Sequence, residues 1–272
     1  MSDHAEKARG FLALHRSERP LLMPNPWDRG SAVLLASLGF QALATTSSGH
    51  AATLGRLDGS VSGEEAIANA AAIVDAVDLP VSADLENGFA DEPAEVARTI
   101  AYAIDAGLAG CSVEDFTRHR DDPVYEIGLA AERVSAAAEE AHQGPVHLVL
   151  TARAENYLYG RRDLADTVSR LQRFQEAGAD VLYAPGMTDL GEIRSLVESV
   201  DRPVNVLAVP AGPPVAELAE VGVRRVSVGG AFAFVALGAV VEAARELQEQ
   251  GTYGYSRLAK IGRDAAFPAF GG

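Results

Sequence analysis

The sequence predicts a single (β/α)₈ barrel that occupies residues 1–272 as one domain. Three observations favour this fold. Short apolar or β-branched runs alternate with longer alanine-rich stretches, which is the pattern of βαβ units and a parallel sheet. Eight such units follow one another without a break in composition. The length of 272 residues also suits one barrel, because this architecture typically takes about 250 residues.

The expected elements follow the apolar runs in chain order. Strands are expected at residues 21–24, 42–47, 80–86, 111–115, 146–152, 181–185, 204–208 and 225–228. Helices are expected near residues 32–37, 64–77, 93–105, 130–142, 164–176, 190–200, 215–220 and 232–248. Several of these helices end in a glycine just before the next strand, as at Gly39 and Gly107, which is typical of a left-handed C-cap. A doubly wound open sheet is the alternative, but no Gly-rich phosphate turn follows the first run.

The C-terminal segment, residues 251–272, follows the last expected helix. It contains four aromatic residues, Tyr253, Tyr255, Phe267 and Phe270. Aromatic side chains at that density are unusual in a loose tail. We therefore expect the segment to pack on its own barrel or on a neighbouring subunit.

Composition excludes several classes of partner. The formal net charge is −15, with 38 acids and 23 bases, and there is no basic stripe with interleaved aromatics, so a nucleic-acid partner is not expected. No apolar run approaches the roughly 20 residues that span a bilayer, so no membrane partner is expected. The first residues, MSDHAEKARG, lack the apolar stretch of a secretory signal. Together with a single cysteine, Cys111, this favours a cytoplasmic protein.

Acidic residues gather where the predicted strands end. Asp84 and Glu86 end the third strand, Glu114 ends the fourth, and Asp58 lies in the long loop after the second. The carboxyl ends of barrel strands face the active site, and alternation places Asp84 and Glu86 on one face of their strand. Converging carboxylates without a His/Cys cluster are typical ligands of Mg²⁺ or Mn²⁺. The alternative is that each acid caps a helix or faces water.

Two further features favour a small anionic carboxylate as the substrate. Residues 45–50, Thr-Thr-Ser-Ser-Gly-His, suit a turn whose backbone N–H groups hold a carboxylate or phosphate, although an ordinary polar turn is the alternative. Arg153 follows the fifth strand and could bind a carboxylate through a bidentate fork. A salt bridge from Arg153 to Glu155 or to one of the metal-site acids is the alternative.

Six short motifs occur in order at barrel-like spacing. They are residues 25–28 (NPWD), 45–49 (TTSSG), 58–59 (DG), 83–88 (ADLENG), 113–115 (VED) and 152–155 (ARAE). In this order they resemble the isocitrate lyase / phosphoenolpyruvate mutase superfamily, over about residues 20 to 240. The resemblance implies a (β/α)₈ barrel whose last helix is exchanged between subunits, and hence a homodimer or homotetramer.

The resemblance also implies roles for individual residues. Asp84 would ligate Mg²⁺ directly, while Asp58, Glu86 and Glu114 would help, partly through bound waters. The remaining roles concern the substrate: the backbone of residues 48–50 with Ser47 would hold its carboxylate, Arg153 would hold its other anionic end, and Trp27 would line the pocket. In such a site, the metal ion would stabilise the charge of an enolate derived from a 2-oxo acid. The residues in question are Trp27, Ser47, Ser48, Gly49, His50, Asp58, Asp84, Glu86, Glu114 and Arg153.

The segment after the fourth strand departs from both family patterns. Lyases of the family carry a Lys-Lys-Cys-Gly-His loop there, and the mutases carry Lys, Lys, Asn and Ser, whereas residues 116–125 read FTRHRDDPVY. Cys111 lies at the start of a strand, where a buried inert thiol is expected. The sequence therefore does not identify the general acid/base. His50 is one candidate, because it lies beside the expected carboxylate cradle, and there are four more. These are His119, Tyr157, Tyr159 and Tyr183.

The leading hypothesis is therefore a Mg²⁺-dependent carbon–carbon lyase for a small 2-oxo or 2-hydroxy di- or tricarboxylic acid, resembling oxaloacetate decarboxylase or methylisocitrate lyase. A phosphoenolpyruvate- or phosphonopyruvate-type mutase or hydrolase is the alternative within the superfamily. A non-catalytic carboxylate-binding homologue is a third possibility. A phosphate site at Gly229-Gly230 would instead indicate a barrel for sugar or flavin phosphates, although a tight turn explains that pair equally simply.

Overall fold

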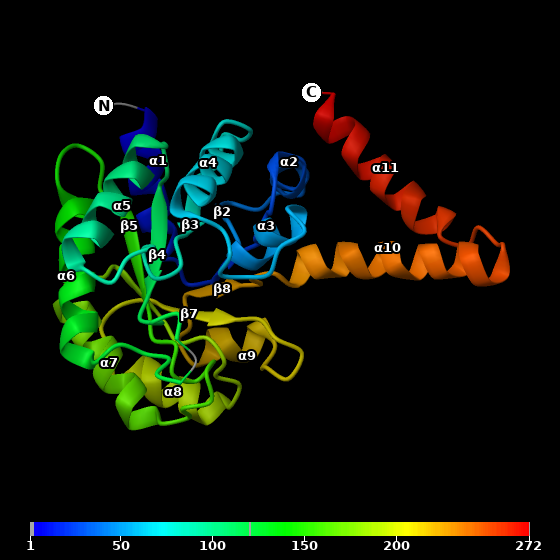
Figure 1. Ribbon diagram of the computed structural model, residues 1–272. Coiled ribbons are helices and arrows are strands. Elements are labelled where there is room, and N and C mark those ends of the chain that lie inside the picture. The colour runs from blue at the N-terminus through cyan, green and yellow to red at the C-terminus, as the bar shows by residue number, and fades with distance from the viewer. Residues whose placement is uncertain (1–2, 120, 272) are drawn as a thin grey trace.

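The computed structural model describes residues 3–119 and 121–271 and confirms the (β/α)₈ barrel (Figure 1). The strands are parallel and pair in the order β1-β8-β7-β6-β5-β4-β3-β2. Their bounds are β1 Leu21–Met23, β2 Leu43–Ala44, β3 Val81–Asp84, β4 Gly110–Glu114, β5 Val149–Arg153, β6 Val181–Tyr183, β7 Val204–Leu207 and β8 Arg225–Ser227. The seam between β1 and β2 is bridged by the Ala44 N–H, which donates to the Pro24 carbonyl at 3.1 Å. The barrel is therefore nearly closed.

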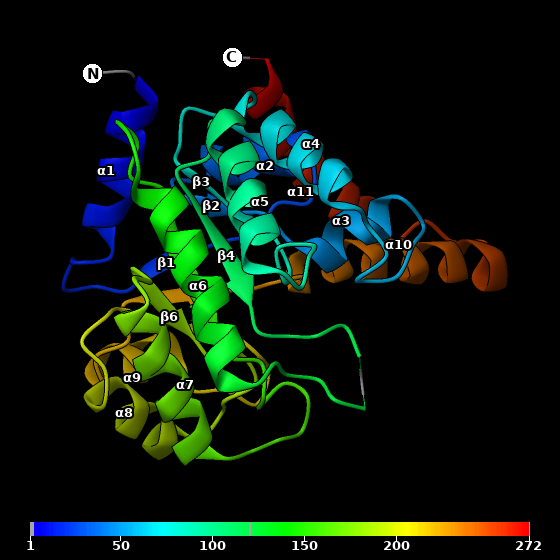
Figure 2. The same cartoon turned by 60° about the vertical axis from the view of Figure 1, so that its left-hand side comes forward.

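Helices alternate with the strands and lie on the outside of the barrel (Figure 2). They are α1 Asp3–Leu14, α2 Arg29–Ser37, α3 Ser47–Thr53, α4 Gly63–Val74, α5 Pro93–Asp105, α6 Ile127–His142, α7 Leu164–Glu176, α8 Leu190–Glu198, α9 Val215–Glu220, α10 Ala231–Gln250 and α11 Ser256–Phe270. Local sequence fixes several starts. Ser62 and Glu65 form a reciprocal capping box before α4, and Pro93 stands at the first position of α5.

Helix α1 closes the amino end of the barrel, and the sequence pattern did not predict it. Its buried Ala8 and Phe11 pack with Met23 of β1 in a separate apolar cluster. Gly110 makes this close approach feasible, because a Cβ there would lie 2.6 Å from the Phe11 ring and 2.8 Å from the Val149 carbonyl. The opposite, carboxyl end is left open for the loops that follow the strands.

The largest difference from the expected elements lies at β2. A strand over residues 42–47 was predicted, but β2 ends at Ala44 and helix α3 begins at Ser47. The cause is the Thr46 side chain, which accepts the Gly49 N–H at 3.3 Å and so caps the helix. The expected polar turn is thus the first turn of a short helix, which points its N-terminus at the carboxyl end of the barrel.

The C-terminal helices form an arm beside the barrel. Helix α10 leads away from the strands and α11 turns back toward α2, which it contacts (Figure 1). Residues 256–270 of the C-terminal segment form α11, which touches helix α2 of its own barrel. Within α10, however, Ala233 is the buried residue and most of the apolar side chains are exposed. None of the described helices combines the length and apolarity needed to cross a bilayer.

Candidate functional site

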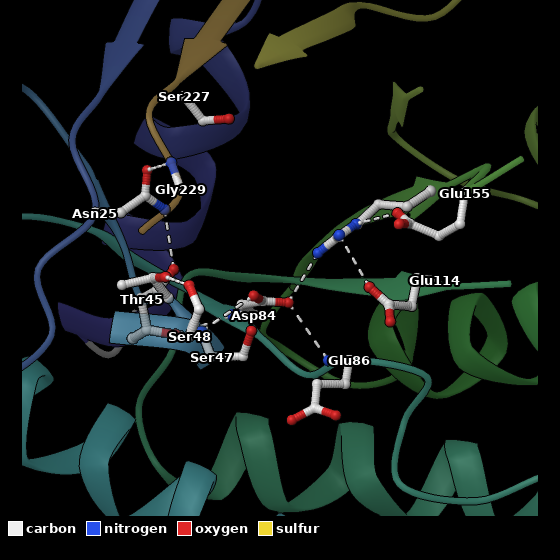
Figure 3. Close-up of polar contacts among 12 residues, drawn as sticks. Asn25, Thr45, Ser47, Ser48, Asp84, Glu86, Glu114, Glu155, Ser227 and Gly229 are labelled. Carbon is white, nitrogen blue, oxygen red and sulfur yellow. Dashed lines mark hydrogen bonds and ion pairs between the residues drawn. The ribbon is translucent and has the colours of Figure 1, made fainter. Parts of the chain in front are cut away.

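Three strand-terminal residues meet at the carboxyl end of the barrel (Figure 3). Asp84 ends β3, Glu114 ends β4 and Arg153 ends β5. The Arg153 guanidinium forms ion pairs with Asp84 at 2.9 Å, with Glu114 at 2.9 Å and with Glu155 at 2.8 Å. Arg153 thus contacts both Glu155 and two of the predicted metal-site acids, so the contacts foreseen as its alternative role are present.

The acids around Arg153 exceed the charge it can neutralise. Burial alone would lower the pKa of Arg153, but Glu155, Glu114 and Asp84 raise it well above its usual range. Burial raises the pKa of Glu114 well above that of a free glutamate. Burial and then Asp84 raise the pKa of Glu86 to about 7. These shifts show that the site disfavours its own negative charge and would gain from a bound cation.

Asp84 is held by residues that follow β2. Its backbone N–H donates to the Thr45 hydroxyl at 2.9 Å, and its carboxylate accepts the Ser47 N–H at 3.2 Å. Figure 3 shows Ser47 and Ser48 beside Asp84, on the side away from Glu155. Two strand ends are therefore locked together, which fixes the carboxylate predicted to be the principal metal ligand.

Glu86 reaches the site by a different route from the expected alternation. Strand β3 ends at Asp84, and Glu86 has φ 47°, a left-handed conformation that non-glycine residues rarely adopt. The turn is anchored from below by buried Arg133, which donates to the carbonyls of Asn87, Ala90 and Asp91. In this conformation the Glu86 N–H donates to the Asp84 carboxylate at 3.4 Å, while the Glu86 carboxylate points away from Asp84 and lines the larger cavity (Figure 3).

The four residues predicted to hold the substrate carboxylate do not all face the same cavity. The N–H groups of Gly49 and His50 donate to Thr46, the residue that caps α3, whereas Ser47 and Ser48 line the cavity beside Asp84. His50 faces a small recess that Asp84 also lines, and its buried Nδ1 has no hydrogen-bond partner among the described residues. Burial lowers the pKa of His50, which favours a neutral ring at pH 7.

Trp27 lies on the other side of α3. It lines a groove with Gly49 and Ala233 of α10, away from the cavities that contain Asp84. A Cβ at Gly49 would lie 3.1 Å from the Trp27 side chain and 3.2 Å from Ala233, so the glycine permits this packing. The placement of Trp27 supports the position of α3 rather than a direct contact with the acids.

Two adjoining cavities open from the acids. One, of about 270 Å³, is lined by Glu86, Glu114, Glu155 and Tyr159 among others, and the second, of about 170 Å³, extends from Asp84 into the barrel. Four residues line both cavities: Ser47, Asp58, Arg153 and Leu158. Asp58 therefore joins the other predicted ligands, and Tyr183, whose orientation the sequence left open, faces the second cavity.

The segment after β4 folds over the larger cavity and contributes residues that the sequence did not single out. Phe116 stacks on Tyr159 with ring centroids 4.0 Å apart. Arg118 donates to the Gly59 carbonyl and lies 3.6 Å from the Glu86 carboxylate. The segment thus supplies a cation where the family pattern has lysines. His119 is exposed and lines neither cavity, and Arg120 lies outside the described residues.

The Gly229-Gly230 turn is already occupied by protein contacts. The Asn25 side-chain oxygen accepts the N–H groups of Val228 at 3.0 Å and Gly229 at 2.9 Å, while its amide donates to the Thr45 carbonyl at 2.9 Å (Figure 3). Asn25 therefore ties the end of β8 to the seam beside β2. This arrangement favours a structural turn over a phosphate site.

The donor set fits a hard divalent cation. Five carboxylates, those of Asp58, Asp84, Glu86, Glu114 and Glu155, line the two cavities, and the cations that line them are Arg153, Arg118 and Arg225. Carboxylate oxygens without imidazole or thiolate ligands match the preference of Mg²⁺ or Mn²⁺.

A second cluster lies at the opposite end of the barrel. The ligand atoms of His142, His147 and Asp180 come within 4.8 Å of one another. His142 ends α6, while His147 and Asp180 precede β5 and β6. Because these positions are at the amino ends of the strands, the cluster is remote from the acids at the carboxyl end.

Comparison with known proteins points to one family. The phosphoenolpyruvate phosphomutase family model matches residues 11–248. A protein of Burkholderia cenocepacia J2315, classed provisionally as a lyase or mutase, superposes with a TM-score of 0.93 at 48% identity, covering 97% of this chain and 95% of its own. The 2-methylisocitrate lyase of Escherichia coli K12 is 30% identical over 75% of this chain and 70% of its own. Oxaloacetate decarboxylase of Pseudomonas fluorescens Pf-5 is 27% identical over 90% and 86%.

Proposed function

Because the chain belongs to the phosphoenolpyruvate mutase/isocitrate lyase superfamily, we propose that it is a Mg²⁺-dependent carbon–carbon lyase. Its substrate would be a small 2-oxo or 2-hydroxy acid with two or three carboxylates. Members of the superfamily include lyases and mutases, and the similarity to 2-methylisocitrate lyase and oxaloacetate decarboxylase favours cleavage of a carbon–carbon bond.

The observation that carries the proposal is the acid cluster around Arg153. Asp84 and Glu114 end adjacent strands, and Glu86 and Asp58 line the same pair of cavities. Asp84 would hold Mg²⁺ directly, with Asp58, Glu86 and Glu114 completing the set in part through waters. When bound, the ion supplies positive charge that stabilises the negative charge developing as a 2-oxo acid becomes an enolate.

Arg153 would orient the substrate. Two of its three ion pairs, with Glu155 and Asp84, are also hydrogen bonds and use two of the five N–H donors of a guanidinium, so donors remain for a substrate carboxylate. The surrounding carboxylates keep it charged and fix the plane of the group. Ser47 and Ser48 add hydroxyl groups on the opposite side of the cavity. The arrangement would hold an acid between Arg153 and the first turn of α3.

The segment over residues 116–125 shapes the choice of reaction. It lacks the cysteine of the isocitrate-type lyases, and the thiol of Cys111 is fully buried in β4, where burial raises its pKa. Cleavage by a loop cysteine is therefore not part of the proposal. Decarboxylation or retro-aldol cleavage needs chiefly the stabilisation of the enolate, which favours an oxaloacetate-like or methylisocitrate-like substrate.

The test replaces the principal ligand. Asp84→Ala should abolish Mg²⁺-dependent turnover and should weaken the binding of oxalate, an enolate mimic, by at least roughly 100-fold. Turnover is measured on oxaloacetate, isocitrate, methylisocitrate and phosphonopyruvate, with Mg²⁺ and with a chelator, and oxalate binding by calorimetry. Asp78→Ala is the matched control, because Asp78 is exposed near the other end of β3.

Each outcome of this panel has a consequence. Oxalate affinity that survives Asp84→Ala would contradict the site assignment. Turnover of phosphonopyruvate alone would favour the mutase or hydrolase alternative. Tight oxalate binding without turnover of any of the four acids would indicate a carboxylate-binding homologue.

We also propose that the protein assembles as a homodimer or homotetramer through the C-terminal arm. Helix α10 exposes Phe234 at 53%, Val235 at 69% and Val240 at 64%, and α11 exposes Phe267 at 70%. Apolar surface of this extent is typical of an interface between subunits. Light scattering should give a dimeric or tetrameric mass, and a monomeric mass at micromolar concentration would contradict the proposal.

A further inference from the structure

The interior of the barrel is polar beneath the acid site. Barrels of this type are usually filled by branched aliphatic side chains. Here four polar residues, Ser82, Ser112, Arg225 and Ser227, line the cavity of about 170 Å³ that extends down from Asp84. All four are at least nine-tenths buried. The residues of the strands thus leave a polar space instead of an apolar plug.

Arg225 is the charged group of this interior. It is 3% exposed, and its Nε donates to the Asn205 side-chain oxygen at 3.1 Å. One Nη donates to the Thr151 hydroxyl at 3.0 Å and lies 3.4 Å from His15 Nε2. Since Thr151 is on β5 and Arg225 on β8, the side chain crosses the barrel. Within residues 3–119 and 121–271, no carboxylate forms an ion pair with it.

The partners of Arg225 are neutral. Burial lowers the pKa of His15 to about 3, so the imidazole carries no charge at pH 7. Burial is also the main cause that lowers the pKa of Arg225, to about 10, which leaves the guanidinium charged at pH 7. Arg225 is therefore a buried cation whose charge is uncompensated by the protein.

Buried Arg170 shows what is missing. It pairs with Asp115 at 3.0 Å and with Asp166 at 2.9 Å. An unpaired buried charge is costly, and proteins seldom retain one without a partner. Because Arg225 lines a cavity, the missing partner can be a ligand.

We propose that Arg225 is a second anion-binding subsite of the pocket and selects substrates with a second carboxylate at the end remote from Asp84. The inference rests on the proposed function, because it assigns the other end of the same substrate. The cavity has Asp84, Asp58 and Arg153 at its mouth and Arg225 with Ser227 inside the barrel. A dicarboxylate can bring one carboxylate to each region. A monocarboxylate with the same 2-oxo or 2-hydroxy acid end leaves Arg225 unpaired.

Malate and lactate provide the test, because both are 2-hydroxy acids and malate alone has a second carboxylate. Calorimetry should show that the wild-type protein binds malate roughly 10- to 100-fold more tightly than lactate, as expected for a hydrogen-bonded charge pair. Arg225→Met should reduce this ratio to below about threefold while oxalate affinity changes by less than about threefold, because an enolate mimic uses both of its carboxylates at the Asp84 end. Arg225→Lys keeps the charge and should retain most of the preference for malate.

Arg224→Met is the matched control. The Arg224 side chain donates to the Glu18 carbonyl outside the cavity, and its removal should leave the malate-to-lactate ratio unchanged. The melting temperature separates a ligand-binding role from a purely structural one. If Arg225 served only to brace the barrel, Arg225→Met would lower the melting temperature and weaken malate and lactate equally, which would overturn the proposal.

Equal affinity of the wild-type protein for malate and lactate would also overturn it, and this measurement needs no variant. The two proposals fail in different ways. If the wild-type protein did not bind oxalate in a Mg²⁺-dependent way, the proposed lyase site would be wrong. A malate preference that does not depend on Arg225 would contradict the subsite alone.

Discussion

The two ends of the barrel treat buried charge in opposite ways. At the carboxyl end, Asp84, Glu114 and Glu155 pair with Arg153, and burial raises the pKa of the nearby Glu86 to about 7. At the amino end, Asp180 accepts hydrogen bonds from His142 and His147, each at 3.0 Å. One end therefore carries excess negative charge, while the other distributes a single carboxylate between two imidazoles.

This difference suggests a functional role for the carboxyl end of the barrel and a stabilising role for the amino end. Asp180 also accepts the Leu150 N–H at 2.9 Å, so the cluster joins the segments that lead into β5 and β6. Its carboxylate is saturated by the protein itself. The carboxylates around Arg153 are not, and such unsatisfied charge is typical of a site that awaits a ligand. Residues at the amino end of a barrel usually serve stability, and we expect the same of this cluster.

The largest effect is expected from Arg153→Met. Removing the guanidinium leaves Asp84, Glu114 and Glu155 buried without their shared partner, and breaking a buried ion pair in this way typically costs about 3–5 kcal/mol. Chemical denaturation should show this loss in the metal-free protein, and Mg²⁺ should recover part of it. Turnover should fall by at least roughly 1,000-fold, because the substrate loses its orienting cation.

Arg161→Met is the control for this variant. Arg161 pairs with Asp122 at 3.1 Å on the surface, where an ion pair contributes less than about 1 kcal/mol. If Arg153→Met were as stable as Arg161→Met, the acids at the carboxyl end would not depend on Arg153 for their charge balance. The contrast between the two ends would then be wrong.

A smaller effect is expected from Mg²⁺ binding to the wild-type protein. At about 100 times its dissociation constant, a ligand that binds the folded state alone stabilises it by about 2.7 kcal/mol. Thermal denaturation should therefore show a rise of roughly 5–10 °C over the chelator-treated protein. Asp84→Ala should abolish this shift and Asp180→Asn should preserve it. The reverse result would place the cation at His142, His147 and Asp180 instead.

The apolar runs located all eight strands, because a buried parallel strand is a local apolar run, although the predicted ends of β2, β3 and β5 differ from the observed ones. The acids at the ends of β3 and β4 could be predicted together, since the carboxyl ends of parallel strands meet at one end of a barrel. The positions of the neighbouring residues were harder to predict. Glu86 depends on a left-handed backbone turn, and Arg118 depends on how a long segment folds over the cavity.

Contacts across the barrel were not predictable from the sequence. Arg225 stands in a run that was correctly predicted as a strand, yet its partner Thr151 lies 74 positions earlier on β5. Which side chains meet inside depends on the tilt and stagger of the strands, and single-sequence patterns do not contain that information. The same limit explains why Arg153 could be proposed as an anion ligand or as a salt-bridge partner of Glu155 or a metal-site acid, whereas its simultaneous pairing with three acids could not be predicted.

The smallest effect is expected from Asp180→Asn, and it should depend on pH. Burial raises the pKa of Asp180, but hydrogen bonds from His142, His147 and Leu150 outweigh it and hold the pKa below its usual range. The stability from Asp180 is thus present above about pH 4, the pKa of an unfolded aspartate, and is lost as the pH falls further. The hydrogen bond to Asp180 raises the pKa of His147, so the contribution of His147 is full below about pH 6.5 and is lost as the pH rises through its folded pKa.

Denaturation of both proteins across the pH range tests this expectation. The difference in unfolding free energy between the wild-type protein and Asp180→Asn should be largest between about pH 4 and pH 6.5. It should reach only about 1 kcal/mol there, because His147 is 38% exposed and solvent screens the pair. The difference should shrink toward pH 9 as His147 loses its proton, while Mg²⁺-dependent turnover stays close to that of the wild-type protein. If the difference in unfolding free energy grew with pH instead, the histidines would not be the groups that stabilise the Asp180 carboxylate. The contrast between the two ends of the barrel would then be wrong.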